Sequence, residues 1–156
     1  TELGRKMLER TLGSNPFTGR LEIYSILLDM VKENPLLGKG FGSTLTEVVN
    51  YTNGHNIYLQ TLAESGIVGF AILLIILGYG LSQSIKVMTR AIWKQKVTYI
   101  ETFCVGYQLY FIIVGFMGNV LYDIFPLVAY MISFAVIQSV REEQTVEARE
   151  EKKLIL

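Results

Sequence analysis

Three long stretches without a charged residue constrain this chain more than any other feature. Residues 65–85 and 102–122 hold 21 uncharged positions each, and residues 124–140 hold 17. A helix needs about 20 apolar residues to cross a bilayer core, with about 17 as the lower limit. We therefore expect an all-α polytopic membrane protein with three transmembrane helices. Pro126 lies near the start of the third, where proline suits the first helical turn.

Basic residues near the membrane ends predict the orientation of these helices. The connection 86–101 is rich in lysine and arginine, whereas residues 40–64 and 119–124 contain neither. We expect 86–101 and the tail 141–156 to lie in the cytoplasm. Residues 1–64 then form an extracytoplasmic loop region with short helices, and the link 119–124 faces the same side.

The exported segment 1–64 contains neither a signal peptide nor an apolar run of spanning length. Its export requires upstream transmembrane helices, so we expect the C-terminal part of a longer polytopic protein. The net charge of zero adds little, because the difference between loops carries the information. Cys104 is the only cysteine, so no internal disulfide is expected.

Local signals predict two helices before residue 34. Residues 1–12 have the pattern of a short helix, and the turn formers at 13–16 end it. Thr18 can cap a second helix over residues 19–33. Asn34 precedes a proline, which disfavours the helical conformation and ends this helix.

A glycine-rich loop over residues 36–43 separates these helices from the first expected span. We expect one unbroken helix from Asn56 to Ile85, whose first turns project outside the membrane. Gly66 and Gly69 lack side chains and so allow another helix or loop to approach this helix closely.

His55 is the only histidine, and it stands just before the first expected span. A lone titratable group at a membrane boundary is a candidate general base for a lipid-linked substrate. A loop histidine more often is solvated or joins a local hydrogen-bond network, so both interpretations stay open. Asn56 can orient the ring, bind a sugar hydroxyl, or cap the following helix.

Two basic residues are candidates for binding an anion. Arg20 opens the helix 19–33, where free N–H groups and the helix dipole favour an anion and the guanidinium matches a phosphate. The alternative is a surface arginine covering the apolar helix face. Lys39 lies in the glycine-rich loop without the spacing of a Walker A motif, so it either assists a diphosphate or binds no ligand. No ligand spacing predicts a metal site.

Taken together, these residues resemble the O-antigen ligase and polymerase superfamily, which are polytopic membrane glycosyltransferases acting on polyprenyl-diphosphate-linked glycans. Three features carry the resemblance: Gly19-Arg20, the Asn-Pro-Leu-Leu-Gly-x-Gly-x-Gly turn at 34–42, and the run His-Asn, nine residues, Gly-x-x-Gly at 55–69. The similarity covers about residues 19–85. It implies the C-terminal part of a larger GT-C-like fold in the cytoplasmic (inner) membrane.

The resemblance also implies a mechanism on the outer face of that membrane. A histidine deprotonates the acceptor hydroxyl, which attacks the anomeric carbon with inversion, while basic residues hold the departing diphosphate. His55 inherits the catalytic role and Arg20 the phosphate-binding role, and Lys39 and Asn56 are further candidates for substrate binding. This segment alone is not expected to be active, because the family's other phosphate-binding residues would lie upstream.

The partners implied by the resemblance are an undecaprenyl-diphosphate-type glycan donor and a lipid or glycan acceptor, as in lipopolysaccharide and other polysaccharide biosynthesis of the cell envelope. The mechanism requires no cofactor, metal or nucleic acid. A ligase and a repeat-unit polymerase fit these residues equally well. A transporter fits less well, because carriers usually place ionisable residues inside their spans. A structural or assembly subunit would tolerate loss of His55.

Overall fold

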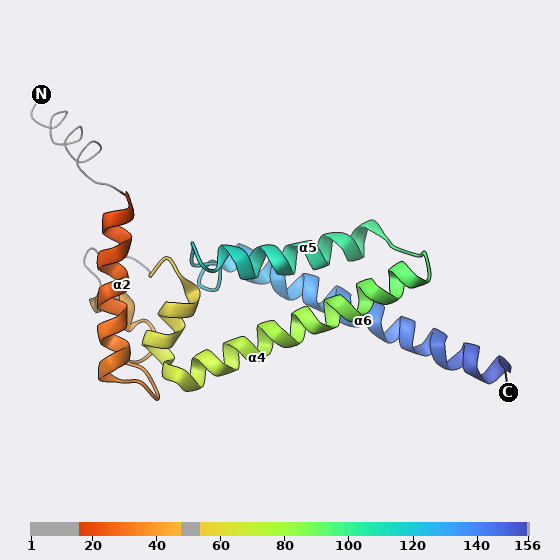
Figure 1. The fold of residues 1–156 in the computed structure, drawn as a ribbon, viewed down its shortest axis with the longest axis horizontal. Coiled ribbons are helices and arrows are strands. Elements are labelled where there is room, and N and C mark those ends of the chain that lie inside the picture. Colours follow the sequence, from red (N-terminus) through yellow and green to blue (C-terminus); the bar gives the residue numbers. More distant parts are fainter. Residues whose placement is uncertain (1–15, 48–53, 156) are drawn as a thin grey trace, which may run out of the picture. The chain divides into compact units, whose positions relative to one another are not determined.

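The computed structural model describes residues 16–47 and 54–155, and all regular structure in these ranges is helical. The all-α prediction is therefore confirmed (Figure 1). The described chain divides after Phe70 into two compact units. The short helix predicted over residues 1–12 lies outside the described residues.

The first unit contains α2 (Pro16–Glu33), α3 (Ser43–Glu47) and the beginning of α4 (Ile57–Trp93). The predicted end of α2 at Glu33 is confirmed, but its predicted start at Gly19 with a Thr18 cap is wrong. The helix begins three residues earlier because Pro16 occupies its first position, where a missing N–H costs no hydrogen bond.

The core of the first unit joins α2 to the beginning of α4. Leu27 and Met30 of α2 are buried against Ala63 of α4. Leu59 of α4 packs on the edge of this cluster. The first turns of α4 therefore pack on α2 through apolar side chains.

α4 is interrupted at Gly66, whose backbone has φ 63° and ψ −167°. Only glycine adopts this combination readily, because a Cβ atom would clash with the backbone. The prediction of an unbroken helix from Asn56 to Ile85 is therefore wrong.

The loop between α2 and α3 supplies the backbone partners that α4 lacks at the interruption. In an uninterrupted helix the N–H groups of residues 67 and 68 would donate to the carbonyls of residues 63 and 64. Here all four groups bond to the loop instead. The bonds are Ile67 N to Pro35 O (2.9 Å), Val68 N to Leu36 O (3.4 Å), Lys39 N to Ala63 O (3.0 Å) and Gly40 N to Glu64 O (2.9 Å).

Two glycines permit this close contact between loop and helix. A side chain at Gly38 would collide with the backbone of Glu64, and one at Gly66 with the backbone of Leu36. The predicted close approach at Gly66 is confirmed. At Gly69 the nearest atoms belong to Ser65 of the same helix, so the prediction for Gly69 is wrong.

The second unit contains the rest of α4 together with α5 (Tyr99–Val114) and α6 (Ile124–Ile155). Thr98 and Glu101 start α5 with a reciprocal capping box. One buried residue from each helix, Val87, Cys104 and Ile137, forms the core. Figure 1 shows α5 and α6 lying side by side.

Helical structure extends further into the expected cytoplasmic parts than the sequence suggested. α4 continues to Trp93, and α6 continues through the tail as far as Ile155. Lys94 joins them, because its Nζ lies 3.0 Å from Glu151 Oε1 and 3.4 Å from Glu147 Oε2. Glu151 and Glu147 raise the pKa of Lys94.

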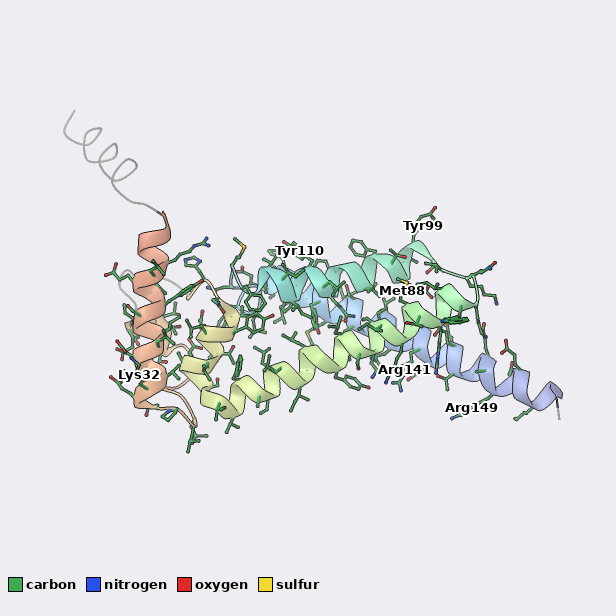
Figure 2. All side chains as sticks on the ribbon, in the orientation of Figure 1. Lys32, Met88, Tyr99, Tyr110, Arg141 and Arg149 are labelled. Atoms are coloured by element: carbon green, nitrogen blue, oxygen red, sulfur yellow. The ribbon has the colours of Figure 1, made fainter. Side chains whose placement is uncertain are left out.

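Among the residues that the structure describes, two helices are long and apolar enough to cross a membrane, namely α4 and the part Ile124–Glu151 of α6. α5 has only 16 residues, roughly 24 Å at 1.5 Å per residue, which is less than a bilayer core of about 30 Å. Tyr99 and Tyr110 point outward from α5 (Figure 2). A third span therefore stays a prediction. Along α4 the exposed apolar side chains include Ile72, Ile75, Ile76 and Ile85.

Candidate functional site

His55 lies two residues before α4 in a backbone conformation that is unusual for histidine. Its φ is +50°, in the left-handed region, and its side chain is half-buried. Among the described residues the imidazole has no hydrogen-bond partner.

Asn56 caps α4 and so fixes the chain immediately after His55. Its Oδ1 accepts hydrogen bonds from Tyr58 N at 3.0 Å and Leu59 N at 3.1 Å. This is the geometry of an N-cap, in which a side-chain oxygen satisfies the free N–H groups of the first turn. The capping alternative is confirmed. A contact between the amide nitrogen of Asn56 and a substrate stays a prediction.

Arg20 lies in the second turn of α2, because the helix begins at Pro16. The free N–H groups of the first turn therefore do not support anion binding at Arg20, contrary to the expectation from the sequence. Arg20 as a whole is half-buried, and none of the ion pairs within residues 16–47 and 54–155 involves it. A guanidinium without a carboxylate partner can bind a phosphate without first breaking an ion pair.

Packing of Gly54 on α2 brings the chain before His55 onto the Arg20 face of that helix. A Cβ atom at Gly54 would lie only 2.8 Å from Leu27 Cδ1, so the two residues are in contact. Arg20 precedes Leu27 by seven residues, which is two turns of the same face and roughly 10 Å along the axis. Arg20 and the backbone of His55 therefore lie on one side of the first unit.

Lys39 is held between two carboxylates. Its Nζ lies 2.9 Å from Glu33 Oε2 and 3.3 Å from Glu47 Oε1. The hydrogen bonds to Glu33 and Glu47 raise the pKa of Lys39, so the ammonium stays charged. An ammonium group has three N–H donors, which leaves one for a further acceptor. Binding of a diphosphate by Lys39 stays a prediction.

The sequence reasoning missed a buried polar cluster beside His55, which consists of Thr44, Gln60 and Glu64. All three are at most 1% exposed, although they lie on α3 and α4 at the edge of the loop region. The hydroxyl of Thr44 donates to Glu64 Oε1. Gln60 and Glu64 lie four residues apart on α4, so they share one face of the helix with the apolar Ala63. This spacing was the one sequence signal that both side chains face inward.

A shallow depression of about 280 Å³ opens next to the cap of α4. Its walls change from polar to apolar along the helix. The residues lining it are Asn56, Tyr58, Leu59, Leu62 and Phe70. Within residues 16–47 and 54–155 no group of three His, Cys, Asp or Glu side chains is placed to hold a metal ion.

Residues 4–74 match the family model described as O-antigen ligase, and this segment includes Arg20, Lys39, His55 and the whole polar cluster. No curated protein and no solved structure matches the chain. At the level of the family, the match implies a membrane glycosyltransferase of the ligase or polymerase type. Residues 4–74 are therefore similar to the O-antigen ligase family.

Proposed function

We propose that the protein transfers a glycan from a polyprenyl-diphosphate donor to an acceptor hydroxyl on the outer face of the cytoplasmic membrane. The observation that carries this proposal is the placement of His55. It stands at the start of an apolar helix, with its ring unbonded among the described residues, on the side of the unit that also bears Arg20.

In the proposed reaction an imidazole nitrogen of His55 accepts the proton of the acceptor hydroxyl. The hydroxyl oxygen forms a bond to the anomeric carbon, and the bond from that carbon to the diphosphate oxygen breaks, with inversion. The guanidinium of Arg20 holds the negative charge that develops on the diphosphate. The remaining N–H of Lys39 and the amide nitrogen of Asn56 supply further donors to the substrate.

The apolar part of the depression below Asn56 supports a lipid-linked donor. Its side chains lead from the polar cap of α4 to Phe70, and the apolar Ile67 and Val68 on the same part of the helix are exposed. A polyprenyl chain lying along this surface would keep its diphosphate near the cap, at the level of His55.

The proposal is tested by His55→Ala in the full-length protein in its native membrane. Loss of a general base typically lowers a rate by about 10²–10⁴-fold, so we expect transfer from the polyprenyl-diphosphate donor to fall by that factor. Expression and membrane insertion should not change. Normal surface glycan in cells that contain only the His55→Ala protein would rule out the catalytic role.

Arg20→Ala tests the binding of the donor. Loss of a hydrogen bond to a charged group costs about 1.5–3 kcal/mol, so we expect the donor KM to rise roughly 10- to 100-fold. Lys32→Ala is the matched control, because Lys32 lies at the other end of α2 and is exposed (Figure 2). Equal donor KM values for the two variants would contradict the role of Arg20.

A further inference from the structure

The polar cluster of Thr44, Gln60 and Glu64 reaches the backbone next to His55. Gln60 Nε2 donates to Glu64 Oε1 at 3.1 Å and to Thr44 Oγ1 at 3.0 Å. At its other end, Gln60 Oε1 accepts the backbone N–H of Gly54 at 2.9 Å. One side-chain amide therefore connects a buried carboxylate to the residue before His55.

Glu64 determines which end of the Gln60 amide faces Gly54. If the amide were rotated by half a turn, its NH₂ group would face the N–H of Gly54. Its oxygen would then face the carboxylate of Glu64. Both contacts are repulsive, and a buried polar group without a partner costs free energy. The acceptor oxygen of Glu64 thus keeps the Gln60 oxygen aimed at Gly54.

Gly54 is held by a hydrogen bond and by packing, and these contacts fix the position of the backbone that leads into His55. Besides the hydrogen bond, a Cβ atom at Gly54 would lie 2.8 Å from Leu27 Cδ1 and 3.2 Å from Gln60 Cβ. His55 then adopts its left-handed backbone before Asn56 starts the helix. A left-handed residue other than glycine persists only when its surroundings hold it, and the contacts of Gly54 and Asn56 do so.

We propose that Glu64 is a positioning residue for His55, acting through Gln60 and Gly54. The role rests on the proposed function, in which His55 is the general base. It requires an acceptor oxygen at position 64 and does not require a negative charge there.

The test compares Glu64→Ala with Glu64→Gln in the full-length protein. Alanine removes the acceptor, and misplacing a catalytic group by about 1 Å can cost about 10²-fold, so we expect kcat to fall by that order. The donor KM should stay unchanged, because Arg20 is untouched. Glutamine retains an oxygen for Gln60 and Thr44, so Glu64→Gln should keep most of the activity. Glu22→Ala, an exposed carboxylate on α2, is the control.

Two results would overturn the proposal. A Glu64→Gln protein as inactive as Glu64→Ala would mean that the charge of the carboxylate takes part directly. A folded Glu64→Ala protein with normal kcat would mean that the cluster does not position His55.

If Glu64→Ala does not fold, the exchanged variant Gln60→Glu with Glu64→Gln decides the question. Its carboxylate at position 60 accepts the N–H of Gly54, and its amide at position 64 donates back to that carboxylate. We expect it to retain kcat, whereas Gln60→Glu alone places two carboxylates together and should lose activity. A folded exchanged variant with the kcat of His55→Ala would contradict the proposal.

His55→Ala separates this inference from the proposed function. If His55→Ala is active, the proposed function itself is wrong. If His55→Ala is inactive while folded Glu64→Ala has normal kcat, only the positioning role is wrong.

Discussion

At the scale of single residues, His55 adopts a backbone conformation that glycine reaches without strain. Its φ of +50° places Cβ close to the backbone, which costs about 1–2 kcal/mol for most residues. Histidine is among the few side chains that tolerate this region.

This conformation predicts different stabilities for two substitutions of His55. His55→Gly relieves the left-handed strain, whereas His55→Ala keeps it, so the glycine variant should be more stable than the alanine variant by about 1 kcal/mol. Both should lack glycan transfer. Thermal unfolding of the two proteins in detergent measures the difference, and a more stable alanine variant would contradict the observed backbone conformation.

The sequence predicted the titratable residue of the site but not what surrounds it. His55 and the cap Asn56 were visible because they adjoin an apolar run. The sequence analysis did not single out Gln60 and Glu64, since nothing in a single sequence shows that Thr44, 20 residues before Glu64, closes over them. Burial of a polar side chain depends on such distant contacts.

At the scale of elements, the interruption of α4 at Gly66 depends on the loop 35–40. The glycine pattern predicted a close approach, but the broken helix follows from four hydrogen bonds to residues about 30 positions earlier. Similarly, α2 begins at Pro16 and not after the predicted cap Thr18, because proline suits the first position of a helix. Contacts of this kind decide helix boundaries beyond local propensity.

Gly66→Ala should destabilise the protein by about 3 kcal/mol or more, because it combines a forbidden backbone conformation with a clash against Leu36. Gly78→Ala is the matched control on the same helix, since nothing lies within 4 Å of its added Cβ atom. It should leave stability unchanged or raise it by up to about 1 kcal/mol. Equal melting temperatures for the two variants in detergent would show that Gly66 is not required for the interruption.

At the scale of the whole molecule, two helices within residues 16–47 and 54–155 pass the length and hydropathy requirements of a membrane span, in agreement with the similarity of residues 4–74 to the O-antigen ligase family. The sequence also predicted a span over residues 102–122, the second of the three, from the absence of charge alone. The helix there ends at Val114, and the next residue, Gly115, caps it. Lack of charge over a stretch therefore did not determine how much of it is helical.

The predicted orientation is testable by labelling single cysteines in a Cys104→Ser background. In intact protoplasts, a membrane-impermeant maleimide should react with Thr46→Cys, because α3 belongs to the unit expected outside. Val97→Cys, in the connection after α4, should react only after permeabilisation. The reverse pattern would place His55 in the cytosol and exclude an external site.

The hydrogen bonds around Gly66 also have a consequence for biogenesis. The ribosome releases residues 35–40 before residues 63–68, so the substitute partners already exist when the apolar helix emerges. Lipid offers no water to satisfy unpaired amides. A nascent chain with the loop deleted would have to rebuild a regular helix through Gly66 or bring four unsatisfied backbone groups to the bilayer, so we expect insertion of α4 to depend on a segment synthesised earlier.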